Sequence, residues 1–376
     1  MNQTLEGMLE QGIEVSLLAM NTARHWVELS ELPDLYSKLA HFDTVYINNS
    51  INPFSAFINL FTDKSYNVNR FVNKQFEKKL LQLLLLNDYD YVWFDSIYTS
   101  PYVDLVAANH TAKRICRVHN IEHHIWQNLT EHEPAFFKKK YLSLLTERLK
   151  KYELDILKRF DFLLPISASE LDFLHQHSSS RIYLLPFGVD TLKHHQEYEM
   201  EYNSCYHIGS MDWGPNIEGV TWFLDEVWPG VLSEIPGISF YIAGKNMPAS
   251  IYSRQSKQVK VLGEIDDFNS FSLQKNIMIV PLRSGAGIRI KILEAMQLGK
   301  TILSTSIGAE GLGLIDHETV FIADDKDTYV AILKKCFSDP ALARRIGDNA
   351  KEFVHSRYNK QELYHNLHTY LSDHKS

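Results

Sequence analysis

The sequence predicts an α/β protein with two doubly wound domains, each built on a parallel sheet. Short apolar runs rich in β-branched residues alternate with helical patterns along the whole chain, and this alternation is typical of parallel sheets. The alternation is interrupted once, where the turn-like sequence at 186–190 leads into a polar stretch at 193–203. A chain of 376 residues is long enough for two domains of ordinary size. We therefore expect the first domain to occupy residues 1–192.

The expected first domain opens in an unusual way. A helical pattern comes first and ends at Gly12, and the first β-rich run follows it at residues 14–19, although such a domain normally begins on a strand. Helical patterns at 73–86 and 134–158 separate some of the later runs. These later β-rich runs lie at 44–47, 91–94, 114–118, 162–166 and 181–185.

The expected second domain, residues 193–352, repeats the alternation. Several of its strands end in a glycine, such as Gly209 or Gly244, and glycine tolerates the close approach of a ligand. The remaining residues, 353–376, are expected to form a C-terminal helix. The β-rich runs of this domain lie at 205–208, 239–243, 260–262, 277–280, 301–305 and 320–322.

The composition argues against several classes of protein. A net charge of −8 argues against general nucleic-acid binding, which needs a cationic face. No apolar run reaches the roughly 18 residues that span a membrane, and the opening residues are too polar for a signal peptide. The three cysteines are widely spaced and form no CxxC pair, which fits a reducing compartment. We expect a cytoplasmic protein without a bound metal.

The segment 277–312 has the order strand, small-residue loop, helix, strand. Its apolar run stops at Pro281, and Arg283 leads into the loop 284–287. Apolar residues then recur at helical spacing as far as Gly299. In this order the loop amides and the helix N-terminus converge on one point outside the strand ends. The segment therefore predicts a phosphate-binding turn.

Two cations strengthen this prediction. Arg289 and Lys291 fall in the first turn of the expected helix, where the helix dipole disfavours each by roughly 0.3–1 kcal/mol. A bound anion would reverse the sign of that contribution. The alternative interpretation is that both side chains bend away into water.

Several segments together resemble the retaining glycosyltransferases of family four, and in particular their bacterial branch associated with polysaccharide synthesis. The resemblance implies the GT-B architecture, in which two Rossmann-like domains face a cleft and the C-terminal helix crosses back onto the first domain. It also implies that the second domain holds the nucleotide donor and the first domain holds the acceptor. The segments that carry it are 117–122, 187–190, 207–213 with 215–216, 281–296 and 308–312.

The resemblance implies a function. We expect the enzyme to move a sugar from a nucleotide-diphosphate sugar to a glycan or lipid-linked acceptor in cell-surface polysaccharide synthesis, without metal or cofactor. The expected catalytic residues include Arg289 and Lys291, since the departing nucleotide carries growing negative charge. The third is His119, which matches the family's first-domain histidine that faces the donor sugar. The expected donor-binding residues are Gly209, Ser210, Arg283, Ser284, Gly285, Ala286, Gly287, Glu294 and Glu310.

Three of these residues have simpler alternative interpretations. The resemblance assigns Glu294 to the donor ribose, yet it also stands at i,i+3 spacing from Lys291. Glu310 has a second interpretation as an acid at a helix N-terminus. His119 has one as a structural histidine at a strand end. A metal site formed by His119 and His123 is disfavoured, because their i,i+4 spacing falls in an expected loop.

The chain departs from the family at two places. Ala286 stands where the wider family has a sugar-contacting glutamate, which the resembling branch often lacks. The central first strand and its glycine-rich loop are missing, so two sheet edges are expected to be unpaired. The alternatives to transferase activity are a catalytically impaired nucleotide-sugar-binding subunit of a glycan assembly complex and, less favoured, a sugar-nucleotide epimerase.

The helical pattern at 134–158 carries aromatic and basic residues that suit a membrane surface. Phe136 and Phe137 precede Lys138, Lys139 and Lys140. We therefore expect peripheral contact with the inner membrane face. The alternative is an ordinary solvated helix face. Further cations follow on the same helix at Arg148, Lys150, Lys151, Lys158 and Arg159.

Overall fold

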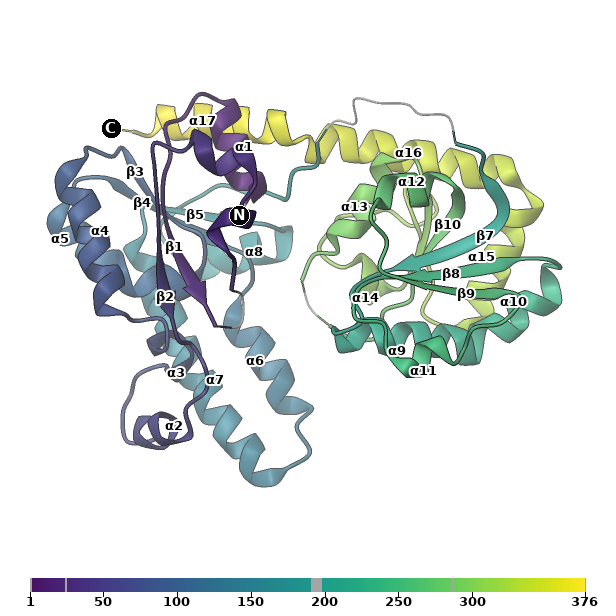
Figure 1. Cartoon of the computed structure of the whole chain (residues 1–376), viewed down its shortest axis with the longest axis horizontal. Helices are drawn as coiled ribbons and strands as arrows, with labels where there is room; N and C mark the ends of the chain where they lie inside the picture. The colour runs from purple at the N-terminus through teal and green to yellow at the C-terminus, as the bar shows by residue number, and fades with distance from the viewer. Residues whose placement is uncertain (1, 24–25, 191–197, 286, 376) are drawn as a thin grey trace. The chain divides into compact units, whose positions relative to one another are not determined.

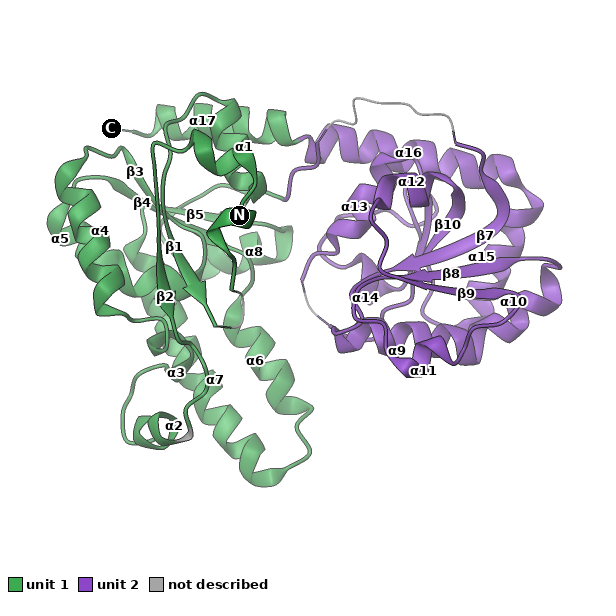
Figure 2. Ribbon diagram, in the orientation of Figure 1, with its two compact units in different colours: residues 1–186, 360–376 green, residues 187–359 purple. Residues whose placement is uncertain are grey.

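The computed structural model describes residues 2–23, 26–190, 198–285 and 287–375 (Figure 1). The chain folds as two compact units (Figure 2). Unit 1 comprises Met1–Pro186 together with Lys360–Ser376, and unit 2 comprises Phe187–Asn359. The sequence had placed these boundaries near residues 192 and 352. Each unit is an α/β structure with parallel strands, as predicted. Among the described residues, no helix is long and apolar enough to cross a membrane.

In unit 1 the described strands form two separate parallel sheets. Strands β1 (Ser16–Thr22) and β2 (His41–Ile47) pair with each other. The second sheet has the order β3-β4-β5-β6. It consists of β3 (Tyr91–Phe94), β4 (Lys113–Val118), β5 (Phe162–Pro165) and β6 (Arg181–Ile182). The expected break in the sheet therefore lies between β1 and β3.

Helices surround these two sheets. They are α1 (Asn2–Glu10), α2 (Pro53–Asn59), α3 (Tyr66–Asn69), α4 (Lys74–Leu86), α5 (Val103–Asn109), α6 (Glu122–Glu131), α7 (Phe136–Ile156), α8 (Ala168–His177) and α17 (Lys360–Asp373). Short 3-10 turns lie at Leu29–Glu31, Asp34–Lys38, Ile97–Tyr102 and Leu157–Arg159. The pattern predicted at 134–158 is thus a single long helix, α7, that ends in such a turn.

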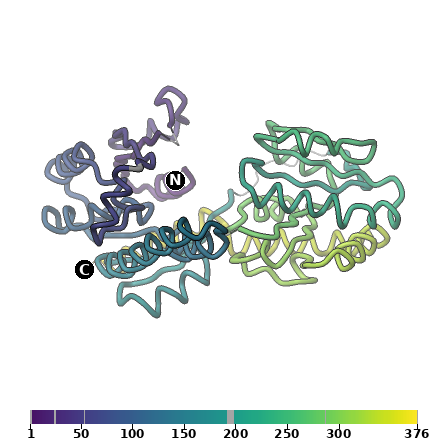
Figure 3. Tube along the Cα trace, turned by 90° about the horizontal axis from the view of Figure 1, so that it is seen from below, coloured from purple at the N-terminus to yellow at the C-terminus, as the bar shows by residue number. Residues whose placement is uncertain are grey.

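The first and last helices of the chain pack on each other within unit 1 (Figure 1). Both ends of the chain therefore lie in this unit, and Figure 3 marks them on the Cα trace. A Cβ atom on Gly7 would come within 2.2 Å of the Tyr364 ring, so only glycine allows α1 to approach α17 this closely. Lys360 is buried, and its Nζ lies 3.1 Å from Oε2 of Glu6. At the other end of α17, the hydroxyl of Tyr91 donates a hydrogen bond to the Leu371 carbonyl. The C-terminal helix therefore belongs to the core of unit 1.

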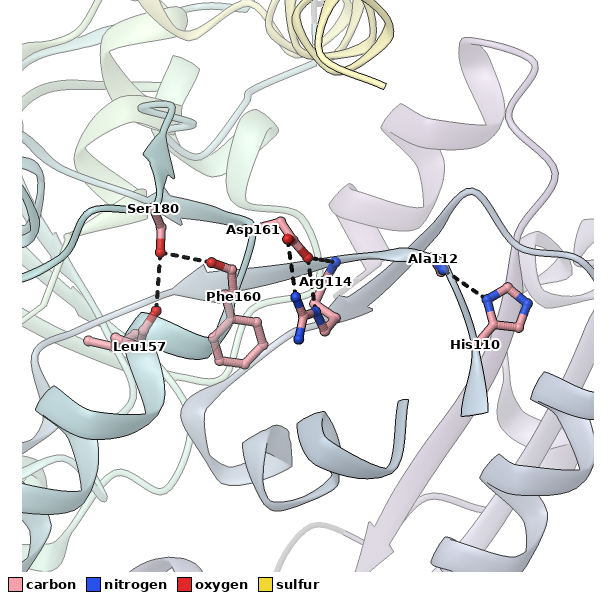
Figure 4. A network of polar contacts seen from close by, with 7 residues as sticks. All are labelled: His110, Ala112, Arg114, Leu157, Phe160, Asp161 and Ser180. Carbon is pink, nitrogen blue, oxygen red and sulfur yellow. Dashed lines mark hydrogen bonds and ion pairs between the residues drawn. The ribbon is translucent and has the colours of Figure 1, made fainter. Parts of the chain in front are cut away.

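Polar contacts fix the ends of neighbouring strands in unit 1 (Figure 4). The Asp161 carboxylate accepts hydrogen bonds from the backbone N–H of Arg114 at 2.8 Å and from its Nε at 2.9 Å. Burial would raise the pKa of Asp161, but the bonds from Arg114 outweigh it and the pKa is lowered. The Ser180 hydroxyl donates to the Phe160 carbonyl at 2.8 Å. These bonds hold the starts of β4, β5 and β6 in register.

In unit 2 the described strands form one parallel sheet of order β12-β11-β10-β7-β8-β9. From β7 the chain continues outward through β8 to β9 at one edge of the sheet. From β10 it continues outward through β11 to β12 at the other edge, so the strand order reverses between β7 and β10. Ligands of doubly wound sheets bind outside the carboxyl ends of the strands at this reversal. The strands are β7 (Glu201–Ile208), β8 (Ser239–Ala243), β9 (Val259–Gly263), β10 (Lys275–Val280), β11 (Thr301–Ser304) and β12 (Phe321–Ile322).

Helices cover both faces of the unit 2 sheet. They are α9 (Gly214–Trp222), α10 (Trp228–Glu234), α11 (Ala249–Tyr252), α12 (Phe268–Leu273), α13 (Ile290–Gln297), α14 (Ser306–Ala309), α15 (Lys326–Ser338) and α16 (Pro340–Tyr358). A π-helical stretch, Phe223–Val227, joins α9 to α10. Both faces of the central strand β10 are buried, because helices pack on each side. The sheet therefore gives the loops at its carboxyl edge a rigid base.

Candidate anion site at the carboxyl ends of β7 and β10

The segments predicted to bind the donor meet at the reversal point of unit 2. Gly209 and Ser210 directly follow β7, and the loop 281–289 follows β10 and leads into α13. These two strands are hydrogen-bonded neighbours. The sequence prediction that loop and helix start at one edge of the sheet is therefore consistent with the topology.

Lys291 links the end of β7 to α9 and α13. Its Nζ donates hydrogen bonds to the Ile208 carbonyl at 2.8 Å and to Oδ1 of Asn216 at 3.1 Å. A Cβ atom on Gly209 would lie 2.9 Å from this Nζ and 2.6 Å from Nδ2 of Asn216. Glycine is therefore required at 209 to leave room for the lysine. Asn216 also donates to the Ser210 carbonyl at 2.8 Å, which fixes the amide orientation.

The Lys291 ammonium is held in an unusual electrostatic environment. Burial lowers its pKa to about 7, and the nearby positive charge of Arg289 acts in the same direction. Both of its hydrogen-bond acceptors are neutral oxygens, so no carboxylate offsets the cost of burying the charge. An anion at this point would raise the pKa, because a nearby negative charge favours the protonated form. The alternative interpretation that Lys291 turns away into water is therefore wrong.

Arg289 is buried with part of its guanidinium unpaired. The residue is 5% exposed, and it stands directly before α13 rather than inside its first turn. Its Nη2 donates to the Gly285 carbonyl at 3.1 Å, and its guanidinium lies 5.2 Å from the centre of the Trp213 ring. Among the described residues, its Nε and Nη1 have no hydrogen-bond partner. A buried donor without a partner costs about 1–3 kcal/mol, and more when the group is charged, so these atoms mark a site for an acceptor.

The glycines of the loop permit a conformation that other residues rarely adopt. Gly285 has φ +102° and Gly287 has φ +93°, both in the left-handed region. A Cβ atom on Gly285 would also come within 2.7 Å of the Trp213 ring. Trp213 therefore packs against the loop, although it was not among the predicted donor-binding residues. Ala286 lies outside the described residues.

Arg283 and Ser284 make contacts on the outer side of the loop. Nη1 of Arg283 donates to the Asp324 carbonyl at 2.7 Å, and its guanidinium lies over the Trp222 ring at 4.8 Å. The Ser284 hydroxyl donates to Glu218 at 2.5 Å. None of these contacts joins either residue to Arg289. The structure thus brings together Gly209, Lys291, Arg289 and Gly285, with Arg283 and Ser284 at the side.

The two glutamates differ in their surroundings. Glu294 lies on α13 and is partly buried, and burial raises its pKa. Lys291 bonds to Ile208 and Asn216, so the i,i+3 pair with Glu294 that the spacing allowed is not formed. Glu310 follows α14 rather than starting a helix, so its interpretation as an N-terminal acid is wrong. Burial lowers the pKa of Arg289, and the charge of Glu310 opposes this change.

His119 belongs to unit 1, where it follows β4. Its Nε2 lies 3.5 Å from Oδ1 of Asp95, the residue that follows β3. Burial would raise the pKa of Asp95, but the contact with His119 outweighs it and the pKa is lowered. His119 therefore faces a carboxylate at the carboxyl edge of the sheet. Asp95 was not among the predicted site residues. Its position directly after an apolar run that forms a strand could have indicated it, because such residues lie at the carboxyl edge of the sheet.

His123 has a structural role. Its Nδ1 lies 2.6 Å from Oε2 of Glu153 on α7, and both residues are buried. The same carboxylate accepts the backbone N–H groups of Glu122 and His123 at the start of α6. In the described part of the chain, no three histidine, cysteine or acidic residues are placed to hold a metal ion.

Comparisons with known proteins show what this chain is similar to. Residues 203–339 match the family described as Glycosyl transferases group 1. Over 308 residues the chain is 28% identical to an uncharacterized 44.6 kDa protein in the cps region of Klebsiella pneumoniae, covering 77% of this chain and 76% of that one.

Solved structures show the fold of the whole chain. Sucrose-phosphate synthase from Thermosynechococcus elongatus matches with a TM-score of 0.69 at 14% identity, covering 99% of this chain and 91% of that chain. Anabaena HepE in complex with UDP and glucose matches with a TM-score of 0.64 at 12% identity, covering 99% and 95%. The chain therefore has the GT-B fold, as the sequence resemblance implied.

The unpaired guanidinium leads to a prediction about Arg289→Gln. We expect its melting temperature without ligand to stay near that of the wild type or to rise slightly, because the variant removes a buried charge with two unpaired donors. Its affinity for a nucleoside diphosphate should fall about tenfold to a hundredfold, the value of one charge-assisted contact. Differential scanning fluorimetry and calorimetric titration measure the two quantities.

Lys300→Met is the matched control for this experiment. Lys300 is another buried cation of unit 2, but its Nζ is paired with the carbonyls of Leu273 and Lys275. Lys300→Met removes these two hydrogen bonds, so the variant should have a lower melting temperature than the wild type. Its affinity for the nucleotide should be unchanged. If Arg289→Gln instead melts much lower and binds the nucleotide normally, Arg289 is a structural residue and the anion site lies elsewhere.

Proposed function

We propose that this chain, whose residues 203–339 match the group 1 glycosyl transferases, transfers a sugar from a nucleoside-diphosphate donor to a glycan or lipid-linked acceptor, with retention of configuration. The observation that carries the proposal is the buried, partly unpaired guanidinium of Arg289 beside Lys291 and the glycine loop. The relative from a cps region favours a role in polysaccharide synthesis. We propose that the protein acts at the cytoplasmic side of the membrane, where nucleotide sugars would be available. The HepE complexes favour a uridine nucleotide as the first donor to test.

The chemistry of the reaction explains why two cations are buried here. Breaking the bond between sugar and diphosphate leaves additional negative charge on the β-phosphate. Cations already fixed at that point stabilise the transition state more than the ground state, because the charge they meet is still growing. Arg289 and Lys291 supply this charge from the protein itself, so the proposed mechanism needs no metal. The departing phosphate oxygen then takes the proton of the acceptor hydroxyl.

Two further residues have proposed roles. We propose that Glu294 accepts hydrogen bonds from the donor ribose, since its partly buried carboxylate lies on α13, the helix that begins beside Arg289. His119 is proposed to contact the transferred sugar, with Asp95 holding its imidazole in position.

The proposed role of Glu294 leads to a prediction. Glu294→Ala should weaken donor binding by about 1.5–3 kcal/mol without unfolding the protein. Unchanged donor affinity in that variant would remove the ribose assignment.

A second candidate is a donor-binding subunit that does not transfer the sugar. It is favoured by the split sheet of unit 1, the unit that the proposal assigns to the acceptor. A donor-binding site in unit 2 would persist in such a protein.

Incubation of radiolabelled UDP-sugars with the protein and bacterial membranes distinguishes these functions. Transfer of label to a glycan or lipid fraction supports the proposal, and Arg289→Gln should lower its efficiency about tenfold to a hundredfold. Arg289→Lys should recover only part of it, because lysine cannot make the bidentate contact. Binding without transfer identifies the subunit, and an altered sugar on the intact donor identifies an epimerase.

We also propose that one end of unit 1 contacts anionic lipid, where the acceptor would be found. Phe136 and Phe137 at the start of α7 are 67% and 85% exposed, and Lys138 is exposed beside them. Phe54 and Phe61, in and just after α2, are also strongly exposed. Exposed aromatic rings beside cations suit the interfacial region of a bilayer.

Contacts within unit 1 bring α2 close to α7 and remove some cations from the expected set. Arg148 on α7 donates to the carbonyls of Asn59 and Leu60 at the end of α2. Arg159 is paired with Asp104. These two arginines are therefore structural, and the proposed lipid contact rests on the start of α7.

Vesicle co-sedimentation tests the lipid contact. The protein should pellet with vesicles containing phosphatidylglycerol and not with pure phosphatidylcholine, and replacing Phe136 and Phe137 by alanine should abolish pelleting. The matched control replaces Leu85 and Leu86, an exposed apolar pair on α4, and should pellet like the wild type. Equal pelleting with both lipids, or no effect of the phenylalanine change, would leave only a solvated helix face.

A further inference from the structure

Helix α2 has its apolar side turned outward. The exposed apolar residues of α2 and of the turn after it follow the i, i+3, i+4, i+7 spacing of one helix face. They are Phe54, Phe57, Ile58 and Phe61, each between 49% and 78% exposed, and we call them the α2 stripe. A surface helix of a globular protein normally packs such a face on the core. Exposed apolar patches of this kind mark a contact with another molecule or with a membrane.

Hydrogen bonds hold α2 in this orientation. Asn59 of α2 is buried, and its Nδ2 donates to the Lys64 carbonyl at 3.0 Å. Arg148 of α7 donates to the Asn59 carbonyl at 2.7 Å. The side of α2 that packs on unit 1 is thus polar, and the side that faces away from it is apolar. Residues 47–62 also contain no charged side chain, so this segment suits an apolar environment.

A polar pocket of about 540 Å³ lies at the start of α2, and we call it the Arg70 pocket. Asn52 and Ser55 line it from the start of α2, and Asn69 and Arg70 line it from the end of α3. Arg70 supplies the only charge among the described lining residues, so no carboxylate in the lining repels an anion. Ser55 directly follows Phe54 in α2, so the pocket adjoins the α2 stripe.

Arg70 has a donor left for a ligand. Its Nη1 donates to the Asn49 carbonyl at 2.9 Å, and its guanidinium lies 5.5 Å from the centre of the Tyr66 ring. Its Nε is buried and has no hydrogen-bond partner among the described residues. A guanidinium binds phosphate oxygens through parallel N–H groups, so an arginine that is held in place and only partly bonded suits a phosphate group.

Neutral donors share the pocket with Arg70. The side chains of Ser50, Ser55 and Asn69 line it and form no hydrogen bond within the described structure, so their hydroxyl and amide groups can donate to a ligand. The Tyr66 hydroxyl donates to the Asn52 carbonyl at 3.2 Å and accepts the Asn52 N–H at 3.1 Å. These two bonds join α3 to the start of α2 and hold the parts of the pocket together.

We propose that the Arg70 pocket binds the phosphate group of an anionic membrane phospholipid, and that the α2 stripe enters the apolar region of the bilayer beside it. A phospholipid carries both a phosphate and apolar chains, so one kind of molecule matches both features. Free phosphate would fill the pocket and leave the stripe in water. A protein that only covered the stripe would leave the guanidinium without an anion.

This inference deepens the lipid contact proposed above and rests on it, and it is independent of the donor site in unit 2. The contact described above uses the start of α7, where Phe136, Phe137 and Lys138 are exposed. Figure 1 shows α2 and the start of α7 at the same end of unit 1. Two separate contacts with one bilayer would fix the orientation of unit 1 on its surface.

Vesicle binding by charge-matched variants tests the pocket. The full chain is sedimented with vesicles containing phosphatidylglycerol and with pure phosphatidylcholine vesicles. Arg70→Gln should lower binding to the anionic vesicles about tenfold, and Arg70→Lys should recover only part of the loss. Arg181→Gln is the matched control and should bind like the wild type, because Arg181 is another arginine of unit 1 that lies over an aromatic ring, that of Phe162.

Two further measurements separate the stripe from the pocket and the lipid from free phosphate. Replacing Phe54 and Phe61 by serine should also lower vesicle binding. A short-chain phosphatidylglycerol, added as a soluble monomer, should raise the melting temperature of the wild type and not that of Arg70→Gln. Inorganic phosphate should raise neither, because it has no apolar chain to cover the stripe.

Several results would overturn the proposal. Equal losses in Arg70→Gln and Arg181→Gln would mean that general charge attraction binds the vesicles. Stabilisation by inorganic phosphate as large as that by the lipid would identify a free anion as the ligand. A dimer that the serine replacements dissociate, without vesicle binding, would assign the stripe to a second copy of the chain.

The outcome is separate from that of the other proposals. If replacing Phe136 and Phe137 has no effect while Arg70→Gln and the serine replacements do, the pocket is supported and the contact at α7 fails. UDP affinity should be the same in all these variants. It therefore reports on the donor site alone.

Discussion

The burial of two cations at the carboxyl ends of β7 and β10 is the constraint on which the rest of unit 2 depends. Arg289 is close enough to Lys291 for its charge to lower the pKa of the lysine, and neither residue is paired with a carboxylate within hydrogen-bond distance in the described structure. Such an arrangement opposes folding unless an anion completes it. The glycine at 209, the left-handed loop and the indole of Trp213 all leave room for or support these two side chains. The proposed donor site is therefore built into the packing of the unit.

Arg289 and Lys291 have different proposed roles in binding the anion. Lys291 already has two neutral partners, Ile208 and Asn216, and so it connects the end of β7 to the helices on either side. Arg289 donates one hydrogen bond, from Nη2 to the Gly285 carbonyl, and its Nε and Nη1 have no partner among the described residues and can donate to a ligand. We infer that Arg289 makes the direct contacts with the diphosphate. Lys291 contributes mainly through the positive charge of its ammonium group. A bound anion favours this charged form by raising the pKa of the lysine.

The sequence predicted the fold well where local patterns carry the information. The order of strand, glycine loop and helix at 277–299 follows from residue spacing, and the structure has β10 and α13 there. The hydrogen bonding of Lys291 could not be predicted from the sequence. Its partner Asn216 is distant in sequence, and no spacing rule relates the two residues. The break beside β3 was expected from the resemblance alone. The apolar cavity of about 450 Å³ beside this break depends on side chains from α1 and α4, which only the folded chain brings together.

The central claim is that an anion binds beside a lysine whose pKa is lowered by burial to about 7. At pH 8 this lysine is mostly neutral, and UDP should raise its pKa, so binding should take up as much as about one proton. Titration calorimetry in HEPES and in Tris measures this uptake, because the heat then depends on the ionisation enthalpy of the buffer. Lys291→Met should abolish the dependence and Lys300→Met should retain it. Equal heats in both buffers for the wild-type protein would contradict the account.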